Sequence, residues 1–172
     1  LLISTVSGAW RYIIGDTIKF TDKEKYEIRI TGRTKFFLNV VGSQLSVNKM
    51  NDAVKDLEDQ FDMSIPEFVV AAKRAEDGEY YHFWYLGTED KKEESALAEA
   101  LDRSLQEANK NYKVARSKAL KGVKVKLTSP DMFHEWNAVN KKKGGQVKME
   151  KVMNEEKFDE WEAFVQQNTS AG

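Results

Sequence analysis

The spacing of apolar and polar residues changes several times along this 172-residue chain. Between residues 17 and 30 the two types alternate in the runs 17–20 and 26–30, which flank a polar segment at 21–25. Alternation of this kind is typical of strands with one buried face, and the polar segment between them supplies a turn. A further extended run is predicted over 35–41. The first part of the chain is therefore predicted to be β-structure.

The period changes to that of a helix at Val47. Apolar residues then recur at spacings of three and four up to Phe61, which is the repeat of one helix face. Two strands are predicted next, over 67–73 and 79–86, with a turn at 76–78. A long helix is expected from Thr88 to near Gly122. Its apolar face consists of Leu97, Leu101, Leu105, Ala108, Tyr112 and Ala115.

One strand and two helices are predicted in the last third of the chain. Residues 123–127 alternate strictly, and Ser129-Pro130 looks like a helix start, since serine caps helices and proline suits their first turn. The final helix is expected after Asn154, and residues 166–172 are expected to fray. The whole order predicts an α+β fold, a small mixed sheet flanked by helices. The apolar side of the first of these two helices consists of Met132, Phe133, Trp136 and Val139.

Composition sets limits on the function. The chain has 27 basic and 28 acidic residues, so no net charge draws it towards nucleic acid or an anionic membrane. It has no cysteine and two histidines, which excludes disulfides, thiolate metal sites and histidine-rich metal sites. No apolar run is long enough to span a bilayer. We therefore expect a cytoplasmic protein without nucleic-acid or membrane partners.

Two charged residues stand at the ends of predicted strands near the start of the chain. Asp16 ends the run Trp10-Arg11-Tyr12-Ile13-Ile14-Gly15-Asp16, and a carboxylate at a strand end suits the two hydroxyls of a ribose. Arg33 follows Gly32, and a guanidinium can hold ribose and phosphate oxygens in a fork. A Gly-Asp pair is also a common turn, and an arginine after glycine is usually a solvated charge. The pair indicates a nucleotide site better than either residue alone.

A glycine-containing segment, Gly144-Gly145-Gln146-Val147-Lys148, would deliver the Lys148 ammonium to a phosphate or carboxylate. The alternative is an ordinary loop lysine, because three others stand at 141–143. Those three are also a candidate RNA contact, but no aromatic residues are interleaved with them. His82 and His134 are expected to be structural, since both lie in aromatic-rich segments. The sequence has no P-loop, Ser/His/Asp arrangement or glycine-rich nucleotide fingerprint.

Taken in order, the motifs at 10–16, 31–33 and 144–148 resemble those of one enzyme family. The chain is similar to the auxin-responsive acyl-acid amido synthetases of the Gretchen Hagen three type, in their bacterial branch, which belong to the adenylate-forming superfamily. The resemblance covers nearly the whole chain. It implies that ATP and Mg²⁺ activate a carboxylic acid to an acyl-adenylate, and that the acyl group then passes to an amine, usually an amino acid. The ATP and acid pockets would lie mainly in a larger N-terminal domain.

The resemblance also implies a role for each candidate residue. Asp16 would bind the ribose hydroxyls, Arg33 would lie beside the ribose and phosphates, and Lys148 would reach the acid carboxylate and the α-phosphate. Residues 1–31 would be the last strands of the N-terminal domain plus the hinge, which Arg29 to Gly32 would form, and residues 32–172 would be the C-terminal lid domain. ATP and Mg²⁺ would be held mainly by the N-terminal domain, so no metal ligand is expected here. We expect a C-terminal piece of a larger enzyme that is inactive alone.

The segment after Lys148 departs from the family pattern. The family often continues with an apolar residue, proline and arginine, whereas Met149-Glu150-Lys151 follows here. Glu150 therefore places a carboxylate two residues from the proposed catalytic lysine. Two other interpretations stay open: a stand-alone α+β regulatory or interaction module, and a weak RNA-binding domain that uses residues 141–143.

Overall fold

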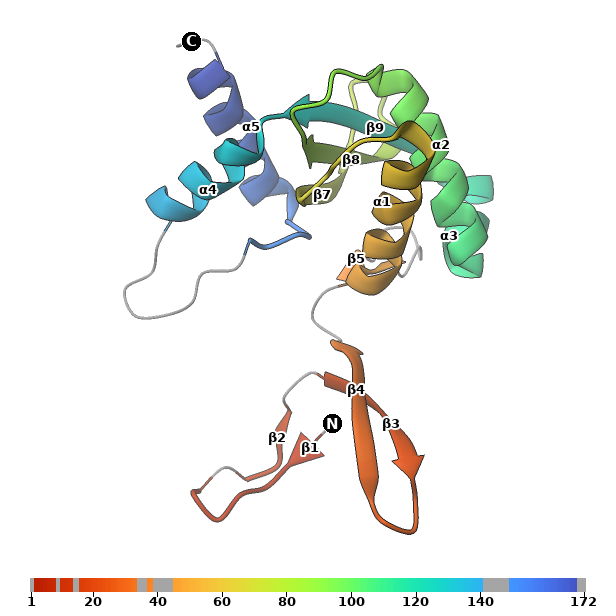
Figure 1. The fold of residues 1–172 in the computed structure, drawn as a ribbon, viewed down its shortest axis with the longest axis vertical. Helices are drawn as coiled ribbons and strands as arrows, with labels where there is room; N and C mark the ends of the chain where they lie inside the picture. The colour runs from red at the N-terminus through yellow and green to blue at the C-terminus, as the bar shows by residue number, and fades with distance from the viewer. Residues whose placement is uncertain are drawn as a thin grey trace. The chain divides into compact units, whose positions relative to one another are not determined.

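The computed structural model describes residues 2–8, 10–13, 16–33, 37–38, 45–140 and 149–169 of the chain. Its contacts divide the chain into two compact units, residues 1–37 (unit 1) and residues 38–172 (unit 2). Figure 1 labels the helices and strands of both units. The domain boundary predicted between residues 31 and 32 falls within strand β4 (Glu27–Arg33). The assignment of residues 1–31 to a separate domain stays a prediction.

Unit 1 contains two antiparallel strand pairs. β1 (Leu2–Ile3) pairs with β2 (Tyr12–Ile13), and β3 (Asp16–Asp22) pairs with β4. The turn between β3 and β4 is held by the Asp22 carboxylate, which accepts hydrogen bonds from the backbone N–H groups of Glu24 and Lys25. The strands predicted over 17–20 and 26–30, and the turn between them, are therefore confirmed.

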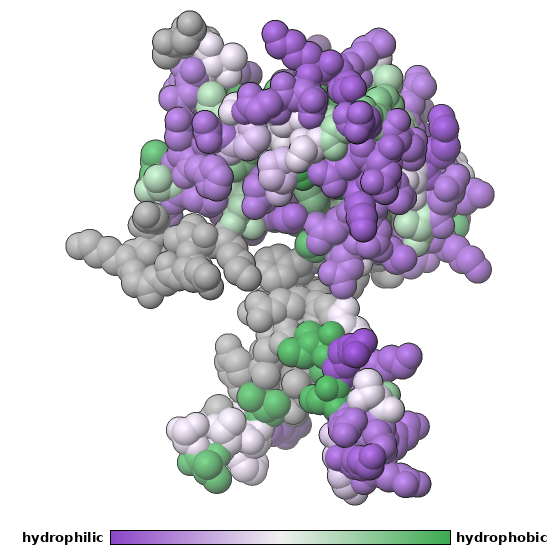
Figure 2. Space-filling view, in the orientation of Figure 1, coloured by the Kyte–Doolittle hydropathy of each residue, from purple (hydrophilic) through white to green (hydrophobic). Residues whose placement is uncertain are grey.

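One face of the β3–β4 hairpin is apolar and exposed. Ile18 lies opposite Ile30 and Phe20 opposite Ile28, and strand alternation places all four on the same face. Phe20, Ile28 and Ile30 are 50%, 47% and 62% exposed. Figure 2 shows hydrophobic residues gathered on the surface of this unit. A two-stranded hairpin alone is marginally stable in water, and the described residues of unit 1 leave this face exposed.

A three-stranded mixed sheet forms the centre of unit 2. β7 (Glu67–Arg74) and β8 (Tyr80–Gly87) are antiparallel neighbours, and β8 runs parallel to β9 (Leu120–Thr128). On the outer side of β7, Val152 forms a parallel bridge with Val70. Figure 1 shows helices on both sides of this sheet. The predicted α+β class and the small mixed sheet flanked by helices are confirmed.

Helices α1 and α2 cover one face of the sheet. α1 (Val47–Phe61) follows the short pair of β5 (Phe37–Leu38) and β6 (Leu45–Ser46), and the Ser46 hydroxyl caps it by accepting a hydrogen bond from the backbone N–H of Lys49. Both helix bounds agree with the predicted periodicity. The first buried core lies between these helices and the sheet, and its fully buried members include Leu45, Met50, Leu57, Phe68, Trp84, Leu86, Leu97, Leu101, Leu105 and Tyr112.

The single long helix predicted over 88–122 is wrong, because the structure has two shorter helices. α2 (Glu94–Ala108) and α3 (Lys110–Lys118) are separated at Asn109, whose φ of −145° and ψ of 112° are extended. The Asn109 side chain accepts hydrogen bonds from the backbone N–H groups of Asn111 and Tyr112, so it caps α3. A side chain that bonds the backbone in this way competes with helix continuation. The apolar period is preserved across the break, which explains why it was invisible in the pattern.

The other face of the sheet is covered by α4 (Pro130–Val139) and α5 (Glu155–Thr169). Ser129 caps α4 as predicted, but Val139 is 74% exposed and takes no part in the apolar side. The fraying predicted from Gln166 is wrong up to Thr169, because α5 continues to that residue. The second buried core lies here and consists of Val69, Ala71, Tyr85, Phe133, Trp136, Met153, Phe158, Trp161 and Val165.

Candidate functional site

The β3–β4 hairpin brings the first two predicted site residues together. The antiparallel register pairs Asp16 with Arg33 and Thr17 with Gly32, at the open end of the hairpin. Directly opposed residues of an antiparallel pair have Cα atoms about 4.5–5.5 Å apart. A carboxylate-bearing and a guanidinium-bearing position therefore face each other across the strands, although they stand 17 positions apart in the sequence. The predicted hinge residues, Arg29 to Gly32, form part of β4.

Lys148 and the lysines at 141–143 lie outside the described residues. The two ends of this segment are fixed, however. Before it, the Asn140 side chain donates a hydrogen bond to the Trp136 carbonyl at 3.0 Å and closes α4. After it, the Lys151 carbonyl accepts from Val70 N–H at 2.8 Å, and Met153 N–H donates to the Val70 carbonyl at 2.9 Å. The described residues before this segment therefore lie at the end of α4, and those at 151–153 after it lie along the edge of β7.

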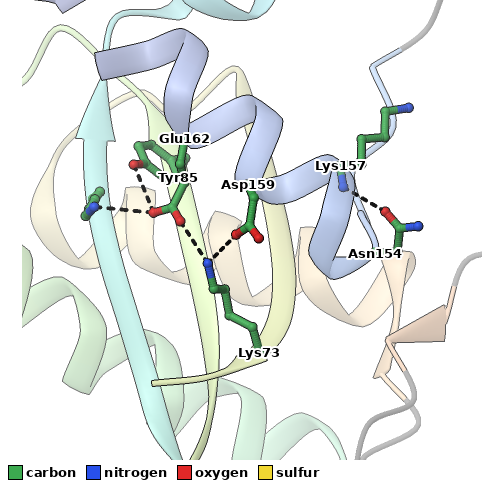
Figure 3. Close-up of polar contacts among 7 residues, drawn as sticks. Lys73, Tyr85, Asn154, Lys157, Asp159 and Glu162 are labelled. Atoms are coloured by element: carbon green, nitrogen blue, oxygen red, sulfur yellow. Dashed lines mark hydrogen bonds and ion pairs between the residues drawn. The ribbon is translucent and has the colours of Figure 1, made fainter. Parts of the chain in front are cut away.

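Glu150, the carboxylate nearest to Lys148 in the following sequence, has a cation of its own. The Nζ atom of Lys157, in the first turn of α5, forms an ion pair and hydrogen bond with Glu150 Oε2. The backbone N–H of Lys157 donates to the Asn154 side chain at 3.0 Å (Figure 3), which holds the start of α5 in place. The Glu150 carboxylate therefore has a cationic partner among the described residues.

A network of charged side chains joins α5 to the sheet (Figure 3). The Lys73 ammonium on β7 donates to Asp159 Oδ1 and, at 3.1 Å, to Glu162 Oε2. Glu162 Oε1 accepts hydrogen bonds from the Tyr85 hydroxyl and from Lys126 Nζ, each at 3.3 Å. The side chain of Glu162 is 18% exposed. A carboxylate largely withdrawn from water therefore meets two ammonium groups and one hydroxyl.

The pKa shifts in this network preserve its charges. Burial works to lower the pKa of Lys73, but its hydrogen bonds to Asp159 and Glu162 outweigh burial, and the pKa is raised. The pKa of Lys126 is raised against burial by Tyr85 and Glu162. Burial is the main cause that raises the pKa of the Tyr85 hydroxyl. Both lysines stay charged and the tyrosine stays neutral at pH 7, so the network fastens α5 and supplies no free base or nucleophile.

A second network ties α2 and α3 to the sheet. Asp102 accepts hydrogen bonds from Arg116 Nε at 2.8 Å, from Arg116 Nη2 at 2.9 Å and from the Tyr112 hydroxyl at 2.6 Å. Arg116 Nη1 donates to the Leu120 carbonyl at the start of β9. His82 lies 5.4 Å from Tyr112 between ring centroids; it is fully buried, and neither ring nitrogen is hydrogen-bonded. Burial lowers the pKa of His82 to about 3, so its ring is neutral at pH 7.

The two histidines lie in different environments. His82 is part of the packed interior, as the structural role predicted for it requires. His134 is exposed on α4. Among the described residues, no group of three histidine, aspartate or glutamate side chains is placed to hold a metal ion. In the same part of the chain, no helix has both the length and the apolar character needed to cross a membrane.

Neither charged network is predicted from the sequence. One signal was available: Asp159 and Glu162 stand three residues apart in the last helix, so both project from one side of it. Side chains alternate between the two faces of a strand, and by this rule Lys73 on β7 and Lys126 on β9 lie on the same face of the sheet as Tyr85 on β8. The missing information was which helix covers that face, because periodicity says nothing about which elements pack together.

A comparison with family models identifies the family of this chain, and a comparison with solved structures shows a similar fold. The family model described as the GH3 family C-terminal domain matches residues 48–157. Among solved structures, the chain is similar to one described as "GH3.15 acyl acid amido synthetase", with a TM-score of 0.73 and 18% sequence identity. That match covers 97% of this chain and 33% of the synthetase, so the chain spans about one third of its length. At this identity the likeness shows the fold alone. No curated protein matches the sequence.

Proposed function

Because this chain belongs to the GH3 family, we propose that it works as the C-terminal part of an ATP-dependent acyl acid amido synthetase. The observation that carries the proposal is the match of the GH3 C-terminal domain to residues 48–157, which span α1 through α4 and the whole central sheet. The similar solved structure is itself described as an acyl acid amido synthetase. The proposed reaction joins a carboxylic acid to an amine or amino acid, with an acyl-adenylate as the intermediate. Its large N-terminal domain would lie outside this chain.

In this proposal Asp16 and Arg33 hold the nucleotide. The register that sets them opposite each other supports a joint role, because a ribose needs acceptors for its hydroxyls while the phosphates need a cation. Asp16 would accept hydrogen bonds from the two ribose hydroxyls. The Arg33 guanidinium would lie beside the ribose and phosphate oxygens, where its planar fork can bind two oxygens at once.

Lys148 would act on the α-phosphate when the acid attacks it. Negative charge builds up there, and an ammonium stabilises that charge most strongly where water is excluded. Closing of unit 2 over the N-terminal domain would bring the lysine in and would shield the adenylate from hydrolysis. The pairing of Glu150 with Lys157 is compatible with this role, because it gives the Glu150 carboxylate a cation other than Lys148.

ATP and Mg²⁺ would be shared unequally between the two parts of the enzyme. Asp16 and Arg33 would give this chain a contact with the nucleotide, and the family resemblance implies that Mg²⁺ is held mainly by the N-terminal domain. We therefore propose that the metal binds to the N-terminal domain and the triphosphate. The acid would be bound there too, so this chain alone would not perform the reaction.

The test is ATP–pyrophosphate exchange by the full-length protein that contains this chain, assayed over a panel of carboxylic acids. Lys148→Ala is expected to lower the exchange rate about 100- to 1,000-fold, the usual loss when a charge-stabilising donor is removed. Lys142→Ala removes a neighbouring lysine of the same segment and is expected to leave the rate unchanged. Asp16→Ala is expected to raise the KM for ATP.

The outcomes separate the parts of the proposal. Exchange that survives Lys148→Ala but weakens with Asp16→Ala would remove the lysine from the mechanism and keep the family activity. Absence of exchange with every acid would favour a stand-alone regulatory or interaction module. Exchange by the 172-residue chain alone would contradict the division of work between two domains.

A further inference from the structure

The outer edge of β9 presents backbone groups that no strand of the described residues pairs. Thr88 N–H donates to the Thr128 carbonyl at 2.9 Å, so the Thr128 peptide faces β8. Leu127 N–H instead donates to the Glu94 carboxylate at 2.9 Å, so it faces away from β8. Because N–H and C=O directions alternate along a strand, Val125 and Val123 face the same outer side as Leu127. The Glu94 carboxylate occupies the Leu127 end of this row of outward-facing backbone groups. No described strand pairs with the groups nearer the start of β9.

The opposite edge of the sheet, formed by β7, is covered by another segment of the chain. There the segment at 151–153 lies along β7, and Val70 exchanges two hydrogen bonds with Lys151 and Met153, at 2.8 and 2.9 Å. One edge of the three-stranded sheet is thus covered by the chain itself, while the other is flanked but not paired in the described part of the chain. An unpaired edge is a template on which a further strand can form.

A groove of about 480 Å³ runs along the open edge, and we call it the edge groove. One wall is the flank of α2, where Ser95 and Ala98 are small and Glu99 stands at the rim. Val123 and Val125 line its floor. Residues 123–127 extend over about 13 Å at 3.3 Å per residue, which is room for a strand of about five residues.

The other wall of the edge groove carries Lys124 and Lys126 together with Glu162, which pairs with Lys126 at 3.3 Å, so this wall keeps one more positive than negative charge. Lys124 and Lys126 lie side by side on the α5 face of the sheet, with Nζ 4.4 Å above the Tyr81 ring and 5.5 Å above the Tyr85 ring. Both lysine side chains are exposed. An added strand would place alternate side chains beside them, where acidic groups would be attracted. Its remaining side chains would face Ser95, Ala98 and Glu99, where small or apolar groups fit and further carboxylates would be repelled.

A second copy of this chain is a poor occupant of the edge groove. If two β9 strands paired edge to edge, the lysines of both copies would share one face and repel each other. Lysines on an edge strand are a known protection against pairing between identical edges. The same charges favour a strand of opposite sign.

We propose that the edge groove binds an extended segment of another protein, in which acidic residues alternate with small or apolar ones. The segment adds to β9 as a further strand, through main-chain hydrogen bonds to Val123 and Val125. One of its carboxylates pairs with Lys124, and the next lies beside Lys126, which keeps its ion pair with Glu162. This docking is separate from the proposed synthetase activity and does not depend on it.

The test uses the 172-residue chain and a fluorescein-labelled seven-residue peptide of alternating glutamate and valine. Binding is followed by fluorescence anisotropy, and amide hydrogen exchange of Val123 and Val125 is followed by NMR. We expect saturable binding, with exchange at both amides slowed at least about tenfold at saturation. Lys124→Glu is expected to lower the affinity for the glutamate peptide about tenfold, because it reverses the charge of one cross-strand pair. Lys55→Glu, an equal charge change on the exposed side of α1, is the matched control and is expected to have no effect.

Two further peptides decide whether a strand is formed. A peptide that carries N-methyl groups on the amides facing β9 keeps its charges but cannot form the main-chain ladder, and it is expected not to bind. A lysine-for-glutamate peptide is expected to prefer the Lys124→Glu protein. Equal binding of the N-methylated peptide, or no binding of the glutamate peptide, would overturn the proposal. If amide exchange at Val123 and Val125 slowed with rising protein concentration in the absence of peptide, the edge groove would bind a second copy of the chain. That result would also overturn the proposal.

Discussion

Replacing His82 by leucine is expected to remove part of the acid sensitivity of unit 2. His82 is completely buried, and neither of its ring nitrogens is hydrogen-bonded. Burial holds its pKa at about 3 in the folded protein, compared with 6.5 for a solvated histidine. The unfolded chain therefore binds the proton more strongly than the folded one, and protonation favours unfolding. Leucine has a similar size and cannot take up a proton.

The magnitude follows from the two pKa values. The contribution is fully present above the unfolded value of 6.5 and is lost as the pH falls through the window down to about 3. Inside this window, one proton lowers the free energy of unfolding by about 1.4 kcal/mol for each pH unit. Between pH 7 and pH 5 the loss is about 2 kcal/mol, because the unfolded histidine is only partly protonated near pH 6.5. Any folded-state pKa below about 4 gives the same result.

The assay is urea unfolding at pH 7 and pH 5, followed by tryptophan fluorescence. Three of the four tryptophans, Trp84, Trp136 and Trp161, lie in unit 2 and report its unfolding. Carboxylates contribute equally to wild type and His82→Leu, so the difference between the two pH effects isolates His82. Wild type should lose about 2 kcal/mol more than the variant.

The control is the same substitution at His134, which is exposed on α4 and is not packed in the core. His134→Leu should therefore lose as much stability on acidification as wild type does. If wild type and His82→Leu differed by less than about 0.5 kcal/mol, which is the usual scatter of such comparisons, the reasoning from burial would be refuted.

Two further substitutions test the packing of unit 2. Asn109→Ala removes the cap of α3 and should lower the free energy of unfolding by about 1 kcal/mol, measured in urea, while Asn109→Asp should retain stability because its carboxylate still accepts the two backbone hydrogen bonds. Equal losses in both variants would contradict the capping role. Gly87→Ala would put a Cβ atom 2.7 Å from Phe133 Cε2 and 3.2 Å from the Glu67 carbonyl, and should cost about 1–3 kcal/mol. Gly122→Ala, whose Cβ would meet Tyr81 at 3.7 Å, should cost clearly less; a similar melting temperature for the two alanine variants would argue against the crowding at Phe133.

The parts of the fold that the sequence predicts well are those set by local periodicity. α1 occupies the predicted residues, and β7, β8 and β9 lie within a few residues of the predicted runs, because alternation or helical spacing reflects one buried face. The break between α2 and α3 was missed for the complementary reason. The apolar face continues across Asn109, and the break depends on a hydrogen bond from one side chain to the backbone.

The candidate site divides in the same way. Opposing positions for Asp16 and Arg33 follow from a hairpin whose two strands and turn can be read from the sequence. The contacts of Glu162 with Lys73, Lys126 and Tyr85 could not be read, because they depend on which helix covers the sheet. Lys148 stays a prediction, based on the family resemblance and on the spacing of its glycines.

The two buried cores of unit 2 are filled by different stretches of the chain, and this has a consequence for synthesis on the ribosome. The fully buried members of the first core all come from residues 45–127. The second core also needs Phe133, Trp136 and Trp161, which are made later. A growing chain can therefore bury one face of its sheet before α4 and α5 have been synthesised. Until then Val69, Ala71 and Tyr85, on the other face, stay exposed. During that interval the nascent protein exposes an apolar surface of the kind that chaperones bind.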